Sequence, residues 1–349
     1  MKLSETINRI APLDQEAMQE ARQRWNSIAK PLHSLGKLED CVCQIAGMTG
    51  DSNVQLDKKA LMVFCADNGV VEEGVTQTGQ EVTAVVAENF LSGQTSAAVM
   101  CRLAGADLYP VDMGIRRATR VPDYHVRRGT ANMVKAEAMT REEGIRAIET
   151  GIRLAGVLKH KGYKIAATGE MGIGNTTTSA AVASVLLSCQ PEEMVGRGAG
   201  LSSGGLERKL QAVKKAITLH RPDPDDPVAV LHKVGGLDLA GLAGFYLGCA
   251  AERLPVLIDG FISATAALAA AKLCPGAKAY MLASHCSKEP GMKKILTYLD
   301  KQAVLHAEMC LGEGTGAVAF LPVLEMGLDV YREMSTFSQI QIESYQELK

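Results

Sequence analysis

The stretch "TGEMGIGNTTTSAA", residues 168–181, combines residues that could bind an anion with one that should repel it. Two glycines precede Asn175 and a run of threonines, which is typical of a strand that turns into a helix whose free N–H groups face a phosphate. Glu170, just before this turn, carries the same sign of charge as a phosphate. Glu170 therefore either points elsewhere or faces a ligand that has a positive centre beside its phosphate.

The sequence contains five glycine-rich turns in which the backbone could approach a ligand closely. They lie at 66–75, 169–178, 196–205, 233–241 and 311–318. Any single turn of this kind could also be a short structural connection between two secondary-structure elements, without a role in ligand binding. Two of them, however, enclose a glutamate, Glu170 and Glu313, and a glutamate between glycines has no obvious packing role. These two carboxylates are therefore our candidates for catalysis or ligand contact.

Some classes of phosphate-binding enzyme are disfavoured because the chain lacks their sequence motifs. The turn at 169–178 has no lysine of the Walker type, which disfavours ATP hydrolysis and kinase activity. The chain also lacks the pair of adjacent acids followed by a Thr-Gly loop that binds a sugar pyrophosphate and its magnesium. The nine cysteines and seven histidines are scattered without metal-binding spacing. We therefore expect a ligand with one phosphate, no protein-bound metal and no cofactor.

Composition excludes several other classes of protein. The 349 residues are 47% hydrophobic and 22% charged, with a net charge of -2, so a basic nucleic-acid-binding surface is not expected. No apolar run reaches the roughly 18 residues of a membrane span, and the first residues do not resemble a secretory signal. We expect a cytoplasmic protein with reduced thiols that binds neither nucleic acid nor membranes.

Periodicity predicts an α/β fold. Short apolar runs at 60–69, 106–114, 164–170, 254–260 and 279–285 are typical of strands. Segments of helical period lie between them, for example 141–160, where Thr140 and Glu143 form a capping box. This alternation predicts a doubly wound parallel sheet, with ligands bound at the carboxyl ends of the strands.

The two ends of the chain differ from the middle. Residues 1–45 and the last 40 or so residues, from Thr315 onward, have a helical period. We expect both ends to pack together as a small helical domain formed by 1–50 and 320–349, beside a large catalytic domain at 51–319.

Motifs along nearly the whole chain resemble, in order, those of the nicotinate-nucleotide:dimethylbenzimidazole phosphoribosyltransferase family. They are "HSLGKLE" (33–39), "ADNGVVEEGVT" (66–76), "GQEVT" (79–83), "GEMGIGNTT" (169–177), "GRGAGL" (196–201), "VGGLDLA" (234–240), "DGFISATAAL" (259–268), "SHCSKEPG" (284–291) and "LGEGTGA" (311–317). A series of this length is far more specific than any one glycine turn.

The resemblance implies a Rossmann-like sheet, a small domain built from both chain ends and a homodimer. It also implies transfer of ribose 5-phosphate from nicotinate mononucleotide to 5,6-dimethylbenzimidazole, which gives an α-riboside phosphate and nicotinate for the lower ligand of cobalamin. The pyridinium cation of this donor lies next to its phosphate. A carboxylate such as Glu170 is then compatible with the ligand.

The resemblance further assigns roles to individual residues. Glu313 would be the general base that takes the proton of the incoming base. Glu170 would stabilise the cationic ribose, although a carboxylate that caps nearby amides is the alternative. Lys209 would lie near the site, with a solvated helix charge as its alternative. The remaining substrate-binding candidates are Gly174, Asn175, Thr176, Thr177 and Gly200 at the phosphate, Gln80, Met171 and Leu311 at the acceptor, and Asp259, Gly260 and Ser287 at the nucleotide.

The sequence departs from the family pattern at Gly79, where many members have proline, and at Ala199, where many have threonine. Both differences leave the aromatic acceptor open. The chain could be one subunit of a heterodimeric relative that activates phenol or p-cresol. Two other classes also remain: a non-catalytic nucleotide-binding regulator and a metal-dependent phosphoribosyltransferase.

Overall fold

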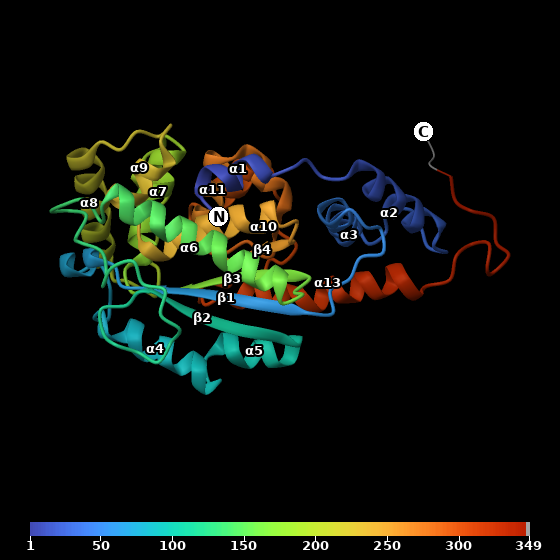
Figure 1. Cartoon of the computed structure of the whole chain (residues 1–349), viewed down its shortest axis with the longest axis horizontal. Helices are drawn as coiled ribbons and strands as arrows, with labels where there is room; N and C mark the ends of the chain where they lie inside the picture. Colours follow the sequence, from blue (N-terminus) through green and yellow to red (C-terminus); the bar gives the residue numbers. More distant parts are fainter. Residues whose placement is uncertain (347–349) are drawn as a thin grey trace.

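A five-stranded parallel sheet forms the centre of the computed structural model, which describes residues 1–346 (Figure 1). The strands are β1 (Lys59–Ala66), β2 (Ala106–Gly114), β3 (Ile165–Met171), β4 (Val256–Ile258) and β5 (Met281–Ala283). Their order is β2-β1-β3-β4-β5, and each of the four neighbouring pairs is parallel. All five strands overlap the segments that the sequence predicts as strands, so the predicted parallel α/β fold is confirmed.

Helices cover both faces of the sheet. One face carries α6 (Arg141–His160), α10 (Leu237–Ala251) and α11 (Phe261–Leu273), and the other carries α4 (Glu81–Ser92), α5 (Ser96–Ala104) and α13 (Thr315–Glu333). Every residue of β1 is buried between these layers, because a central parallel strand has apolar neighbours on both faces. Helix α6 has the predicted bounds and the predicted Thr140–Glu143 capping box.

The remaining helices pack around these layers. They are α1 (Leu3–Arg9), α2 (Gln15–Ser27), α3 (Lys37–Thr49), α7 (Asn175–Leu186), α8 (Ser203–His220), α9 (Pro227–Val234) and α12 (Met292–Leu299), with 3₁₀ turns at Gly69–Glu73, Pro191–Glu193 and Pro275–Tyr280. Helices α7, α8 and α9 lie at the end of the sheet where the strands finish, and α2 and α3 lie at the opposite end (Figure 1). Because the strands are parallel, the turns that follow them gather at the first of these ends.

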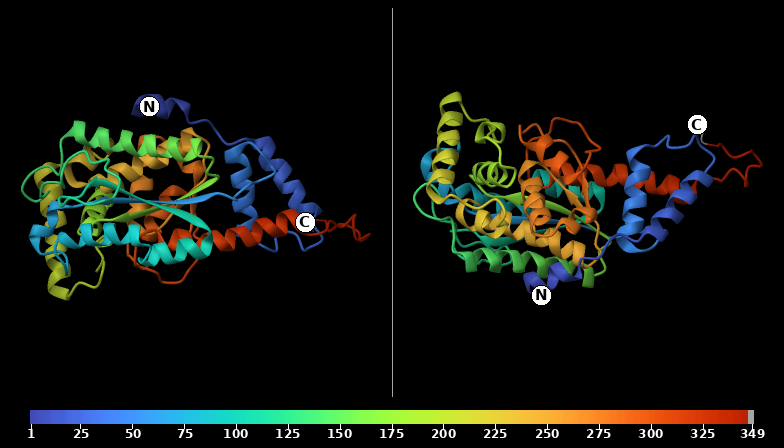
Figure 2. Two further views of the ribbon diagram at one scale, coloured as in Figure 1. Left: turned by 60° about the horizontal axis from the view of Figure 1, so that its bottom comes forward. Right: turned by 90° about the horizontal axis from the view of Figure 1, so that it is seen from above.

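Segments from both ends of the chain lie together. Helices α2 and α3 pack against each other, and α3 packs against α13; Figure 2 shows both helices beside the far end of α13 from two further directions. Helix α1, in contrast, packs against α6 and α10. The two-domain division stays a prediction, and its boundary at 319/320 falls inside the continuous helix α13.

The helix expected from Thr315 onward is shorter than predicted. It ends at Glu333, because Met334 adopts an extended conformation. The following residues form turns, and Ile28 and Thr336 form an isolated antiparallel bridge. Residues 347–349 of the predicted small domain lie outside the described residues.

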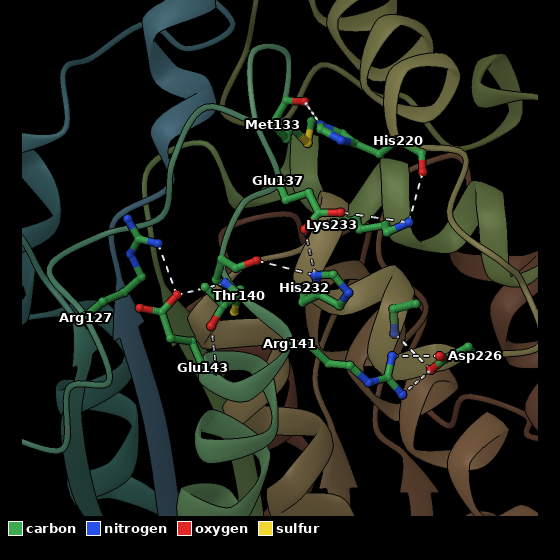
Figure 3. A network of polar contacts seen from close by, with 12 residues as sticks. Arg127, Met133, Glu137, Thr140, Arg141, Glu143, His220, Asp226, His232 and Lys233 are labelled. Carbon is green, nitrogen blue, oxygen red and sulfur yellow. Dashed lines mark hydrogen bonds and ion pairs between the residues drawn. The ribbon is translucent and has the colours of Figure 1, made fainter.

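Residues 115–140 connect β2 to α6 without a helix or strand and are held by polar contacts (Figure 3). Arg127 binds Glu143 at the start of α6, and His220 Nε2 lies 2.8 Å from the Met133 carbonyl oxygen. None of residues 115–140 lines the cavity at the carboxyl ends of the strands. None of the helices in the described part of the chain has the length and apolar character needed to cross a membrane.

Candidate active site

A cavity of about 290 Å³ lies at the carboxyl ends of the strands. The chain runs outward from β1 to β2 and then returns to β3, and such a switch point is where doubly wound sheets bind ligands. The cavity is lined by Glu170, Met171, Gly174, Asn175, Thr176, Asp259, Gly260, Ser287, Leu311 and Glu313 among the residues predicted from the sequence. Segments that are far apart in the sequence thus meet at one place.

Glu170, at the end of β3, is a buried carboxyl group of the cavity wall, only 6% exposed. Its Oε2 accepts a hydrogen bond from the side-chain amide of Asn175. Burial, followed by the nearby Asp238, raises the pKa of Glu170 to about 8. The side chain of Asn175 is therefore engaged with a carboxyl group, and the phosphate contact expected for this residue stays a prediction.

Glu313 lies opposite β3 in the turn before α13 and has a left-handed backbone with φ of 60°. Such a conformation is uncommon for a residue other than glycine. The backbone of Glu313 passes so close to Gly169 that a Cβ there would lie 2.5 Å from the Glu313 carbonyl oxygen. Its Oε2 accepts a hydrogen bond of 3.2 Å from the Ala97 N–H at the start of α5. Burial raises the pKa of Glu313, and this hydrogen bond opposes the increase.

Asp259 holds the turn that carries Glu313. Its carboxylate accepts hydrogen bonds from the N–H groups of Gly314 (3.2 Å) and Ala317 (2.9 Å) at the start of α13. The His285 ring also faces this carboxylate, with 3.9 Å between Nδ1 and Oδ1. Burial raises the pKa of Asp259 and lowers that of His285. Asp259 therefore helps to position Glu313, and its contact with the nucleotide stays a prediction.

Lys209 does not line the cavity but lies behind its wall. It is fully buried in α8, and its Nζ donates hydrogen bonds of 2.9 Å to Thr176 Oγ1 and to the Gly196 carbonyl oxygen. Burial lowers the pKa of Lys209 to about 8. The alternative of a solvated helix charge is wrong, because the ammonium group is buried against the first turn of α7.

Three predicted substrate-binding residues lie beside the cavity without lining it. Gln80 donates a 2.7 Å hydrogen bond to the Asn68 carbonyl oxygen. Thr177 is fully buried in α7, and its Oγ1 has no hydrogen-bond partner within residues 1–346. Gly200 accepts a hydrogen bond from the Gln77 amide. Their contacts with a substrate stay predictions.

Several polar side chains of the site were not selected from the sequence. Arg197, His285 and Glu289 line the cavity, and all three lie within quoted motifs. Asp238, buried beneath the cavity at the start of α10, also lies in a glycine-rich turn, after Gly235 and Gly236. The criterion that selected Glu170 and Glu313, a carboxylate close to glycines, could therefore have found Asp238. Within the described part of the chain, no three His, Cys, Asp or Glu side chains are grouped as a metal site requires.

Comparisons with known proteins agree with this architecture. A family model described as phosphoribosyltransferase matches residues 10–342. The nicotinate-nucleotide–dimethylbenzimidazole phosphoribosyltransferase of Ruminiclostridium cellulolyticum is 49% identical, with both chains covered completely. The enzyme of that name from Acetivibrio thermocellus is 48% identical over 99% of both chains.

A solved structure is similar over nearly the whole fold. The crystal structure of CobT from Thermus thermophilus superposes with a TM-score of 0.90 and 37% identity, covering 95% of this chain and 100% of that chain. The sheet, the turns that carry the two glutamates and the full-length sequence similarity therefore lead to one conclusion. The chain belongs to the nicotinate-nucleotide:dimethylbenzimidazole phosphoribosyltransferase family.

Proposed function

We propose that the protein transfers ribose 5-phosphate from nicotinate mononucleotide to 5,6-dimethylbenzimidazole or a related lower-ligand base. The products are an α-riboside 5-phosphate and nicotinate, used in assembling the nucleotide loop of a cobamide. Relatives that are 48–49% identical over essentially the full length carry the name of this activity. The observation that carries the proposal is that Glu170 and Glu313, from distant turns, line one cavity that also holds the start of α7.

The start of α7 suits the phosphate of the donor. Gly174, in the left-handed region with φ of 93°, precedes the helix, and Gly174 and Thr176 both line the cavity. A helix N-terminus favours an anion, because its first N–H groups have no partner within the helix. The Lys209 ammonium group, bound to Thr176, adds a positive charge behind this wall. The phosphate would therefore lie on the α7 side, with the ribose directed toward the glutamates.

The chemical step exchanges one C–N bond for another. The bond from ribose C1′ to the pyridinium nitrogen breaks, and nicotinate leaves with the bonding electrons. A ring nitrogen of the incoming base forms the new bond from the opposite face, through a transition state of oxocarbenium character. This inversion converts a β-nucleotide into an α-riboside.

Two carboxyl groups serve different needs of this step. The incoming base becomes cationic when its nitrogen bonds to C1′, and its other ring nitrogen must then lose a proton. Glu313 is the candidate acceptor of that proton, and its raised pKa makes it a better base near neutral pH. Glu170 is the candidate for stabilising positive charge on the ribose. It can do so only as a carboxylate, so a proton that it holds at neutral pH must leave first.

The finer assignments stay predictions: the acceptor, the contacts of Gln80 and Ser287, the homodimer and the cytoplasmic location. Phenol is a more demanding acceptor, because its oxygen must lose a proton before or during attack. A heterodimeric phenol-activating relative would therefore differ from this chain in its acceptor range.

The test is a chromatographic assay of the purified protein with nicotinate mononucleotide, no added metal, and dimethylbenzimidazole, adenine, phenol or p-cresol. We expect a riboside phosphate from the benzimidazole and a 10²–10⁴-fold loss of kcat in Glu313→Gln, the usual contribution of a general base. Glu308→Gln is the matched control, because Glu308 is exposed in the same loop and does not line the cavity.

Each result distinguishes one alternative. Product from phenols only would assign the chain to the phenol-activating group, and activity that requires magnesium would indicate a metal-dependent enzyme. Binding of the nucleotide without product from any acceptor would favour a regulator. A Glu313→Gln enzyme as active as Glu308→Gln would remove Glu313 from the role of base.

A further inference from the structure

One amide group joins two buried carboxyl groups at the end of the sheet. Asn175 Nδ2 donates a hydrogen bond to Glu170 Oε2 and a second one, of 3.2 Å, to Asp238 Oδ2. Glu170 comes from β3, Asn175 from α7 and Asp238 from α10. A side-chain NH₂ group has two hydrogens, so each carboxyl group receives one.

Asp238 is held firmly in this position. It is fully buried, and its Oδ1 accepts a 2.9 Å hydrogen bond from the Leu239 N–H. Gly172 lies against its carboxyl group so closely that a Cβ there would be 2.7 Å from Asp238 Oδ2. The two carboxyl groups are therefore kept near each other by packing as well as by Asn175.

Their surroundings contain negative or neutral groups. Asp259 follows β4, Glu313 precedes α13, and both raise the pKa of Glu170. The Cys65 thiol of β1 lies close enough to interact with Glu170 and Asp238, and burial raises its pKa, which keeps it neutral. His285 faces Asp259, and burial lowers its pKa. Of residues 1–346, no Lys, Arg or His forms an ion pair with Glu170 or Asp238.

We propose that Asp238, held beside Glu170 through Asn175, is a positioning residue whose negative charge keeps Glu170 protonated in the ligand-free protein, and that the cationic nucleotide displaces this proton. Two adjacent carboxylates in a buried site without a cation would repel each other, so one proton is retained. A pyridinium ring beside Glu170 supplies the missing cation. Glu170 then ionises and can stabilise the ribose as the C–N bond breaks. This inference rests on the proposed donor, nicotinate mononucleotide.

The balance of the step is simple. The Glu170 carboxyl group loses a proton to solvent when the nucleotide binds. The positive charge that leaves with this proton is replaced by the positive charge of the pyridinium ring. Burial together with Asp238 raises the pKa of Glu170 to about 8, and burial raises that of Asp238 to about 6, which agrees with the proton residing on Glu170.

The direct test needs no catalysis. Infrared spectra of the full chain with ¹³C-carboxyl-labelled glutamate should show a protonated carboxyl band at pH 6.5 that is missing in Glu170→Gln and titrates with a midpoint near pH 8. Asp238→Asn removes the neighbouring charge, so the midpoint should fall by about one unit or more. Asn175→Ala removes a hydrogen bond that favours the carboxylate form of Glu170, so the midpoint of the Glu170 titration should rise in this variant.

Asp112→Asn is the matched control. Asp112 is also buried and accepts hydrogen bonds from the Gly114 and Ile115 N–H groups, but it lies in β2, and no hydrogen bond joins it to Glu170 within residues 1–346. Its loss should lower stability and leave the Glu170 midpoint unchanged. A midpoint that stays in place in Asp238→Asn would overturn the role of Asp238, and so would a wild-type protein without the protonated band.

Binding and kinetics test the second half of the inference. Calorimetry at pH 7 in buffers of different ionisation enthalpy should show proton release when nicotinate mononucleotide binds to the wild type and none for Glu170→Gln. The pH profile of kcat/KM for Asp238→Asn should shift to lower pH with the infrared midpoint. Binding without proton release would refute the displacement. If the nucleotide did not bind, the proposed function would fail, and the infrared titration would still decide whether Asp238 controls the proton on Glu170.

Discussion

At the scale of single residues, the two glutamates of the site differ in their surroundings. Glu170 is buried among acids and shares an amide with Asp238. Glu313 is half-buried and faces the N-terminus of α5 through the Ala97 N–H. A helix N-terminus favours the carboxylate form, so Glu313 is better suited to begin the reaction ionised. The difference in surroundings therefore matches the two different roles that we propose.

Lys209 and Thr176 should act as one unit. Lys209 reaches Thr176 Oγ1 and not the cavity itself. We expect Lys209→Met and Thr176→Val each to raise the KM for the nucleotide about 10- to 100-fold, because a hydrogen bond to a charged group contributes about 1.5–3 kcal/mol. The double mutant should be little worse than either single mutant. Steady-state kinetics of the four proteins measures this.

The control for this pair is Lys215→Met, which removes an exposed lysine from the same helix, α8. Its KM should equal that of the wild type. Strictly additive effects of Lys209→Met and Thr176→Val would show instead that Lys209 contacts the nucleotide on its own.

At the scale of elements, the site depends on close backbone contact between β3 and the turn before α13. Gly169 has no side chain, so the Glu313 carbonyl oxygen and the Gly314 N–H can lie against the strand. Asp259 fixes the same turn from the end of β4. The position of Glu313 is thus set by backbone packing and a helix cap, and its left-handed conformation is maintained by both.

Gly169→Ala should therefore affect catalysis through the backbone. Its Cβ would lie 2.5 Å from the Glu313 carbonyl oxygen and 2.9 Å from the Gly314 nitrogen, so the turn must move. We expect kcat to fall at least about 10-fold, since a small displacement of a catalytic group is costly, together with a lower melting temperature. Gly156→Ala in α6 is the control, because no atom lies within 4 Å of its Cβ, and it should keep full activity and gain up to about 1 kcal/mol of stability. A stable, fully active Gly169→Ala enzyme would contradict this account.

The sequence predicts elements well where one local pattern determines them. Helix α6 follows its capping box and its apolar face, and the strands follow short apolar runs bounded by glycine or polar residues. The prediction that the helix continues beyond Glu333 was wrong, because sequence periodicity does not show where a helix loses contact with the elements it packs against. The contact of Asn175 with Asp238 was also missed, since it spans 63 residues and arises only when α7 and α10 meet at the end of the sheet.

At the scale of the whole molecule, the sheet places the acidic site and the small group of helices at opposite ends (Figure 1). Helices α2, α3 and the end of α13 lie beyond the amino ends of the strands, whereas the cavity lies at the carboxyl ends. The stability of the site therefore depends mainly on the packing around β1 and β3. That packing includes the buried acids, so the stability of the fold should depend on pH.

The free energy of unfolding should fall as pH rises from about 5 to 8. The pKa of Glu170 is about 8 in the folded protein and near 4.5 when the chain is unfolded, so the folded state binds more protons between these values. A group whose pKa is raised by folding stabilises the fold below its unfolded pKa and loses that contribution as pH passes through the folded value. Asp238, with a pKa of about 6, acts in the same direction at the lower end of the window. His285, whose pKa burial lowers, acts in the opposite direction only below about its ordinary value of 6.5.

Urea unfolding at pH 5.5 and 8.0 measures this dependence. One group of this kind contributes a slope of at most about 1.4 kcal/mol per pH unit, so Glu170→Gln should flatten the curve by up to this amount. Glu72→Gln is the control: the hydrogen bond from Lys135 lowers the pKa of this surface carboxylate, which confines its contribution to pH values below about 4.5. Its curve should run parallel to that of the wild type above pH 5. Equal slopes for the wild type and Glu170→Gln would mean that Glu170 is ionised throughout, and the proton that we assign to it would then have to reside on another group of the site.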